Sequence, residues 1–430
     1  MLWLGAVHIG NRTNMAVCSL ATALAFGLMR LMHGGVVAMS ALAVGLALTA
    51  CATAGGPHSA SLTASSSTAK PTTAKTATAK PAAITATPTA TASQPAPVTS
   101  VHVVAGNPDG HAYVPPAARA VNTSHPNHVI GSGTPASCIP AAVVKAVAKG
   151  GVITFNCGPK PVTITMNATA KVVNTSRRVV LDGGGLITLS GGGKREILYM
   201  DTCDQKQIWT TDHCNNQEWP QLVVQNITFE DGYSPIRETA GTPYGGGGGG
   251  AIYAEGGQLK VVDSRFIDNR CYTFGPDLGG AAIRAISQWS KRPVYITSDT
   301  FHGGRCSNGS ALSSIASSWD VLNSVMTDNR AIGWGANPAS PGTPGGGSGG
   351  AIYTDGDNYN VTIAGTIIRN NSAREGGGAV FFVVDNNEGT LTIKDSTLHN
   401  NPSGEFFTAG YPGIFFHSSG HPIVTDSTIN

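Results

Sequence analysis

Three aspartates near the C-terminal end of the chain are the residues best suited to hold a metal ion. Asp355 and Asp357 follow one short apolar stretch, and Asp385 follows the next stretch of the same kind. Calcium takes several oxygen ligands, mainly from carboxylates, so these side chains are candidate calcium ligands. The alternative is that they are turn residues, because aspartate bonds readily to the nearby backbone. We favour turns and therefore expect no resident cofactor.

Aromatic side chains outside the expected core form a second group with chemistry to offer. Aromatic rings provide large apolar contact surfaces for sugars. Trp289 and Trp334 lie in predicted loops, and with Tyr353 they are candidate glycan contacts. Trp319 falls at a position expected to face the core, where it would contact no ligand.

Cysteines form a third group. Six of the eight cysteines lie beyond residue 100, and no Cys-x-x-Cys spacing that would suggest zinc is present. An even number in an exported chain predicts disulfides, and free buried cysteines are the alternative. The expected pairs are Cys138–Cys157, Cys203–Cys214 and Cys271–Cys306.

The first part of the chain predicts export. An apolar run at 36–48 is shorter than the roughly 20 residues that span a bilayer, and is typical of a signal peptide. The Leu-Thr-Ala-Cys sequence that ends at Cys51 resembles the lipobox of bacterial lipoproteins. This resemblance implies cleavage before Cys51, a lipid on its sulfur, and anchoring in the bacterial cell envelope. An ordinary signal peptide is the alternative, and translation from Met29 rather than Met1 would give the usual signal length.

Composition divides the chain into four segments. Residues 1–50 form the leader and signal peptide. Residues 51–100 are dominated by Ala, Thr, Pro and Lys, which cannot build a core, so this segment is expected to be a disordered tether. Residues 101–135 read as an irregular lead-in, and residues 136–430 contain the repeats that must position the candidate side chains.

The repeats predict a solenoid. Stretches such as LKVVDSRFIDN recur about every 25 to 42 residues, and GGAI-like stretches lie between them. Alternation of apolar and polar residues predicts short strands, and one coil alone cannot bury its apolar face. Stacked coils would place Phe266 over Phe301. A helix at 141–149 would cap the first coil. Four asparagines are expected at the bends: Asn269, Asn329, Asn371 and Asn401.

These repeats resemble a known family. GGAI at 249–252 and 349–352, with FIDN at 266–269, are similar to the repeats of polymorphic outer-membrane proteins. More broadly, residues 138–430 resemble the pectin-lyase-like superfamily. That resemblance implies an all-β, right-handed parallel β-helix, a fold that hosts many different functions.

Polysaccharide lyases and glycoside hydrolases share this fold, but the hydrolase motifs Asn-Thr-Asp, Asp-Asp, Gly-His-Gly and Arg-Ile-Lys are absent from the chain. We therefore expect a non-catalytic, adhesin-like surface protein that binds extracellular glycans or other surfaces and contacts the membrane through its lipid. A lyase or hydrolase is the first alternative, and a structural envelope protein is the second. A net charge of +2, with 12% charged residues, argues against a nucleic-acid partner.

Overall fold

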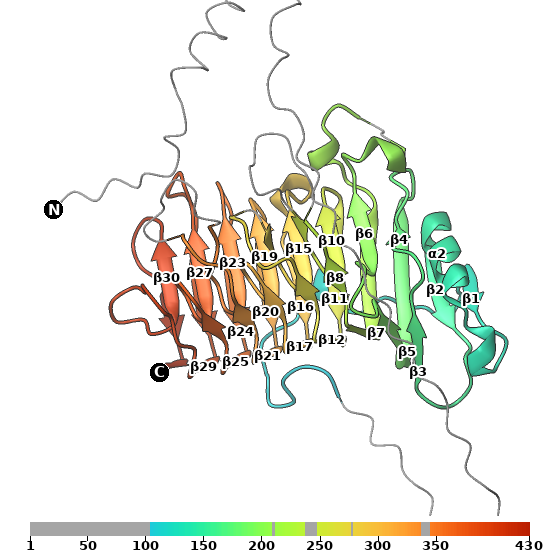
Figure 1. The fold of residues 1–430 in the computed structure, drawn as a ribbon, viewed down its shortest axis with the longest axis horizontal. Coiled ribbons are helices and arrows are strands. Elements are labelled where there is room, and N and C mark those ends of the chain that lie inside the picture. Colours follow the sequence, from blue (N-terminus) through green and yellow to red (C-terminus); the bar gives the residue numbers. More distant parts are fainter. Residues whose placement is uncertain (1–103, 209–210, 237–246, 277, 337–344) are drawn as a thin grey trace, which may run out of the picture. The chain divides into compact units, whose positions relative to one another are not determined.

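The computed structural model describes residues 104–208, 211–236, 247–276, 278–336 and 345–430 (Figure 1). All of them belong to the unit Val101–Asn430. The predicted signal peptide, Cys51 and the tether lie outside the described residues. Within these ranges, no helix combines the length and the apolar character needed to cross a bilayer.

Parallel strands dominate the described residues and stack into three main sheets. Sheet A contains β1 (His128–Ile130), β2 (Gly151–Phe155), β3 (Val162–Thr165), β5 (Arg178–Ser190), β7 (Gln221–Glu230), β11 (Gln258–Val262), β12 (Arg265–Ile267), β16 (Val294–Thr297), β17 (Thr300–His302), β20 (Trp319–Leu322), β21 (Val325–Thr327), β24 (Val361–Ala364), β25 (Ile367–Arg369), β28 (Leu391–Lys394), β29 (Thr397–His399), β31 (Ile423–Thr425) and β32 (Thr428–Ile429). Sheet B contains β4 (Ala170–Lys171), β6 (Leu198–Asp201), β10 (Ile252–Glu255), β15 (Ile283–Ile286), β19 (Leu312–Ile315), β23 (Ile352–Asp355), β27 (Val380–Val383) and β30 (Ile414–His417).

The smaller elements complete each coil. Sheet C contains β8 (Tyr233–Ser234), β13 (Arg270–Cys271), β18 (Arg305–Cys306), β22 (Arg330–Ala331) and β26 (Ser372–Ala373), and a further pair is formed by β9 (Gly247–Gly248) and β14 (Leu278–Gly279). Short 3-10 turns are η1 (Pro116–Ala118), η2 (Pro135–Ser137), η3 (Gln205–Gln207), η4 (Cys214–Asn216) and η5 (Trp289–Lys291).

The chain passes through these sheets in a fixed order. After β15 in sheet B it forms β16 and β17 in sheet A and β18 in sheet C, and then returns to sheet B as β19. Each strand therefore pairs in parallel with its equivalent in the next coil. These stacked parallel sheets are consistent with the parallel β-helix, or solenoid, that the repeats predict.

The interior consists of aligned side chains. Phe266 pairs with Phe301 and their rings stack at 4.7 Å, while Phe229 and Phe266 stack at 5.3 Å. Trp319 is fully buried, and its indole Nε1 donates to Ser314 Oγ at 2.8 Å. The predicted stacking of Phe266 on Phe301 and the core position of Trp319 are both confirmed.

Polar ladders run along the bends. Between the two sheet-A strands of a coil, a hydroxyl side chain accepts the backbone N–H of its equivalent in the preceding coil. Thus Ser324 N donates to Thr366 Oγ1 at 3.2 Å, and Thr366 N donates to Ser396 Oγ at 3.1 Å. At the following bend, Asn329 N donates to Asn371 Oδ1 at 3.0 Å and Asn371 N to Asn401 Oδ1 at 3.1 Å. The asparagines thus satisfy backbone groups that a bend would leave without partners.

All three predicted disulfides are present. The Cα–Cα distances are 5.7 Å for Cys138–Cys157, 5.0 Å for Cys203–Cys214 and 4.7 Å for Cys271–Cys306. The last pair joins equivalent positions of neighbouring coils.

Helix α2 (Pro140–Lys149) lies beside β1, β2 and β4, at the end of the stack where the chain begins to wind (Figure 1). Pro140 occupies its first turn, where proline suits the helix, and Gly150 ends it with a φ of 73°. Val143 and Val147 are fully buried against the core.

The lead-in segment packs against the outer face of sheet A. Its residues 106–123, here named the strap, cross the outer face of sheet A from later coils to earlier ones. Asn107 Nδ2 donates to Gly365 O at 2.8 Å. Further along, Ala112 exchanges two hydrogen bonds with the Asn323 amide, and Val121 exchanges two with the Gln225 amide. The sequence predicts an irregular segment here but not this position.

Candidate functional site

The outer face of sheet B carries one continuous row of side chains. In β23, Ile352 and Thr354 are fully buried, so the residue between them points away from the core. The parallel register aligns the equivalent residue of each other strand of the sheet with this outward position. The row consists of Lys171, Tyr199, Tyr253, Arg284, Ser313, Tyr353, Phe381 and Phe415.

The later half of this row is aromatic and partly exposed. Tyr353 and Phe381 stack at 4.9 Å, and Phe381 and Phe415 stack at 5.0 Å. Phe406 meets Phe381 and Phe415 edge-on at 6.3 and 4.8 Å. We name these four residues the aromatic ridge. Rings stacked in this way present their edges outward, as a line of apolar C–H groups.

Apart from the exposed Lys171 at its end, the earlier half of the row is buried. Tyr199 and Tyr253 stack at 5.5 Å and are only 8% and 7% exposed. Arg284 is 3% exposed and donates to Ser313 Oγ at 2.5 Å. A ligand that approaches sheet B can therefore reach the ridge but not this earlier half.

Each tyrosine of the row donates to a carboxylate two residues further on. The hydroxyls of Tyr199, Tyr253 and Tyr353 bond to Asp201, Glu255 and Asp355 at 2.8, 2.8 and 3.0 Å. Among the described residues, one group of three potential metal ligands lies within 4.8 Å, namely Asp201, Cys203 and Glu255. Because Cys203 is bonded to Cys214, it offers no thiolate, and this group has only two carboxylates to bind a metal.

The three candidate calcium ligands are not brought together in this way. Asp355 accepts from Tyr353 and from Gly356 N, and Asp357 accepts from Asn386 N at 3.0 Å. Asp385 is exposed. Burial raises the pKa of Asp355, the Tyr353 hydrogen bond opposes the rise, and the nearby charge of Asp385 adds to it. Asp355 bonds to the adjacent backbone N–H, as a turn residue does, whereas Asp357 bonds to the backbone of the next coil.

Trp334 lies in the segment that leads from β22 into β23. It is 38% exposed, and the Arg374 guanidinium lies 5.9 Å from its ring centroid. The neighbouring Glu375 accepts from Gly335 N at 2.9 Å, and its backbone carbonyl accepts from Phe406 N at 3.2 Å. The Glu375 side chain is 5% exposed, and its Oε2 has no hydrogen-bond partner. Glu375 thus links the segment that holds Trp334 to Phe406 of the ridge through hydrogen bonds.

Trp289 lies elsewhere. It begins η5, which follows β15 and leads into sheet A. It therefore lies at the C-terminal ends of the sheet-B strands, whereas Trp334 precedes β23 and lies at their N-terminal ends. The Arg292 guanidinium lies 4.8 Å from its ring centroid. Of the three predicted glycan contacts, Tyr353 belongs to the ridge, Trp334 precedes β23 and Trp289 follows β15.

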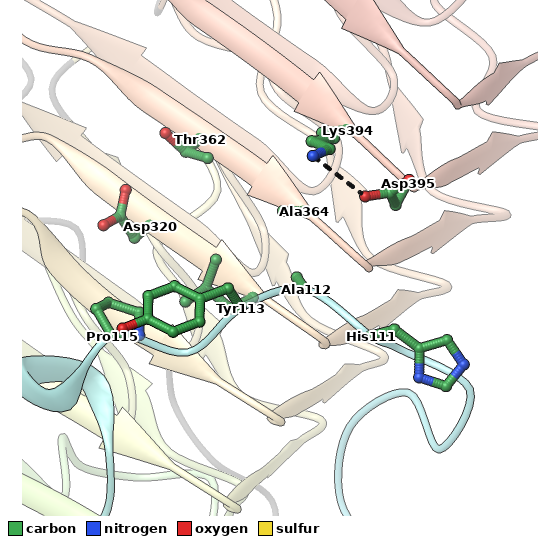
Figure 2. Close-up of a pocket in the computed structure, with 10 residues that line it drawn as sticks. His111, Ala112, Tyr113, Pro115, Asp320, Thr362, Ala364, Lys394 and Asp395 are labelled. Atoms are coloured by element: carbon green, nitrogen blue, oxygen red, sulfur yellow. Dashed lines mark ion pairs between the residues drawn. The ribbon is translucent and has the colours of Figure 1, made fainter.

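The strap leaves two cavities on sheet A. The first, of about 490 Å³, lies between strap residues such as His111 and Tyr113 and the strand residues Asp320 and Thr362 (Figure 2). Burial raises the pKa of Asp320, and a hydrogen bond from Thr362 opposes that rise.

The second cavity, of about 210 Å³, is lined by Arg178, Lys260 and Arg292. Lys260 Nζ donates to Arg119 O at 2.7 Å. Burial and the nearby Arg178 charge lower the pKa of Lys260. No sequence signal predicts either cavity, because both depend on where the strap lies.

No protein-family model, curated protein or solved structure matches this chain. What stands is a mainly β fold of stacked parallel sheets, with a partly exposed aromatic ridge on one of them.

Proposed function

We propose that this protein is a lipid-anchored cell-surface protein that binds extracellular glycans at the aromatic ridge without cleaving them. The observation that carries the proposal is the partly exposed stack of Tyr353, Phe381 and Phe415. Exposed apolar surface is costly in water, and contiguous patches of it commonly mark binding sites.

The ridge has features that suit a sugar chain. Its ring edges offer apolar contact to the C–H groups of sugar rings, while Asp355 offers a carboxylate acceptor for hydroxyl groups. A mainly apolar surface with a few placed polar groups is the usual composition of a small-molecule site.

We further propose that the fold is a right-handed parallel β-helix of the pectin-lyase-like superfamily, with repeats of the polymorphic outer-membrane type. Crossovers between parallel strands are right-handed in nearly all proteins, which supports this handedness. Helix α2 would serve as the cap of the first coil, because its buried Val143 and Val147 cover apolar surface there.

Export and anchoring rest on the apolar run at 36–48 and on the Leu-Thr-Ala-Cys sequence that ends at Cys51. The tether at 51–100 would hold the solenoid away from the membrane. Intact mass measurement of the protein from a bacterial host tests this, since Cys51→Ser should remove a diacylglycerol-sized mass increment. An unmodified Cys51 in the mature protein would contradict it.

Glycan binding is tested on a glycan array with the full chain. We expect binding that is lost in the double variant Phe381→Ser and Phe415→Ser. Serine is chosen because Ser313 occupies the same row in β19. Tyr113→Ala is the matched control, since Tyr113 is an exposed aromatic residue of the strap. Absence of any glycan ligand, or equal binding by the double variant, would refute the proposal.

A polysaccharide lyase or glycoside hydrolase is the second candidate function. Asp355 favours it, because a carboxyl with a raised pKa can act as a general acid, and both Asp385 and Arg284 act on its charge. Release of unsaturated products from pectin or alginate, or of new reducing ends, would establish cleavage, and Asp355→Asn should then abolish it. A purely structural envelope protein would show neither glycan binding nor turnover.

A further inference from the structure

Three arginines form a row on the outer face of sheet C. Arg270 pairs with Arg305, and Arg305 pairs with Arg330, in the parallel register of β13, β18 and β22. In each of these two-residue strands the arginine is exposed and the next residue is buried. Because neighbouring strands lie about 4.8 Å apart, the three side chains leave the surface at a regular spacing along the solenoid axis.

The scaffold behind this row fixes its register. The residues that follow Arg270 and Arg305 are Cys271 and Cys306, which are buried and joined by a disulfide. Just before the row, buried Asn269 and Asn329 bond to the backbone of neighbouring coils. The arginines are therefore held side by side by covalent and hydrogen-bonded contacts that lie beneath them.

Three aligned arginines lower the stability of the folded chain when no ligand is bound. Like charges at directly opposed positions of neighbouring strands destabilise a sheet. Among the described residues, none of the three arginines has a carboxylate within 4.0 Å; the nearby ion pair His302–Asp328 does not include them. A ligand with repeated negative charges would relieve the repulsion that the fold leaves in place.

We propose that Arg270, Arg305 and Arg330 bind an anionic polysaccharide that lies along the solenoid axis. A guanidinium group matches carboxylate and sulfate oxygens with two parallel hydrogen bonds, which lysine cannot do. A chain with an acidic group on successive sugars engages several arginines at once, so weak single contacts add to a useful affinity. The outward residues at the two ends of the row, Tyr233 and Ser372, offer hydroxyl groups to the same chain.

This binding row is independent of the aromatic ridge. It lies on another sheet, and its interaction is electrostatic, so it weakens with added salt, whereas apolar contacts at the ridge do not. The small net charge of +2 shows that the clustering comes from register and not from composition.

The test measures affinity of the full chain for polygalacturonate, heparin and a single-stranded DNA oligonucleotide at several salt concentrations. We expect binding to at least one of the two glycans, weakening as salt rises. The triple variant Arg270→Gln, Arg305→Gln and Arg330→Gln should lose about tenfold in affinity at low salt. The corresponding triple lysine variant should lose less, because it keeps the charge and loses only the paired hydrogen bonds.

A matched control removes the same charge elsewhere. The triple variant Lys145→Gln, Lys160→Gln and Lys194→Gln changes three exposed cations and should bind as the unaltered chain does. The melting temperature of the arginine-to-glutamine variant should not fall, since it loses only repulsion.

Preference between polygalacturonate and heparin identifies the anionic group as carboxylate or sulfate. Four results would overturn the proposal: no salt-dependent glycan binding, full binding by the glutamine variant, an equal loss in the lysine control, or DNA bound at least as tightly as both glycans.

Discussion

The outer faces of sheets A and B are built on the same interior and differ in what covers them. On sheet A, the strap lies across the strands and exchanges paired hydrogen bonds with buried Asn323 and Gln225. On sheet B, the aromatic ridge remains partly exposed. Stacking of the coils determines which side chains can face the core. The outward-facing side chains can instead contact another part of the chain or a ligand. We therefore propose that the outer face of sheet A serves the structure of the chain and that the outer face of sheet B binds a ligand.

The largest expected effect comes from loosening the strap. Gln225→Ala removes two bonds to Val121 and one to Asp182, and leaves buried polar groups without partners. We expect a loss of about 2 kcal/mol in the free energy of unfolding, measured by urea denaturation, together with faster proteolysis within 104–123. Glycan binding at the ridge should not change. An unchanged free energy of unfolding and an intact strap in this variant would contradict a structural role for the outer face of sheet A.

A smaller effect is expected at Asp299, the buried carboxyl that interrupts the hydroxyl ladder of sheet A. Burial raises its pKa well above the usual value, and the charge of Asp263 adds to this, while hydrogen bonds from Ser264 and Thr297 oppose it. The folded state therefore binds this proton more tightly than the unfolded state. The free energy of unfolding should fall as pH rises from the unfolded pKa of about 3.9 through the raised folded value.

Asp299→Ser restores the residue type found at Ser324 and Ser396 and should remove this fall. The expected gain in the free energy of unfolding at neutral pH is on the order of 1 kcal/mol. Thermal denaturation of both proteins from pH 4 to pH 8 gives the comparison. If the two curves run parallel, Asp299 contributes nothing to the pH dependence of stability.

At the ridge we expect little change in stability. Phe381→Ser alters a partly exposed side chain, so the free energy of unfolding should fall by less than about 1 kcal/mol, while glycan binding falls strongly. Urea denaturation and glycan titration of the same variant separate the two effects. A large loss of stability would make the ridge a structural element and would remove the contrast with sheet A.

The smallest effect is expected from calcium. Since Asp355 and Asp357 bond to the backbone and the three aspartates form no compact group, calcium should cause no saturable rise in melting temperature. A saturable rise that Asp355→Ala abolishes would establish a calcium site on sheet B.

The residues that stack in the interior could be predicted because the sequence repeats show which positions are equivalent. The spacing of Phe266 and Phe301, the asparagines at the bends and the matching positions of Cys271 and Cys306 all follow from aligning the repeats. Stacking then turns equivalent sequence positions into spatial neighbours.

The outer features could not be predicted in the same way. The strap has no repeat, and its partner Gln225 lies 104 residues from Val121, so nothing local encodes the contact. The register of the arginine row follows from the same alignment, but the exposure of its three side chains is known only from the structure. Trp289 and Trp334 look alike as loop tryptophans, yet chain order places them at opposite ends of the sheet-B strands.

Hydrogen–deuterium exchange of the full chain, with and without a glycan found on the array, tests most directly whether glycans bind at the outer face of sheet B. We predict that the glycan slows exchange in β23, β27, β30 and residues 405–411, and leaves exchange in the strap unchanged. Protection confined to the strap and the outer face of sheet A would contradict the account.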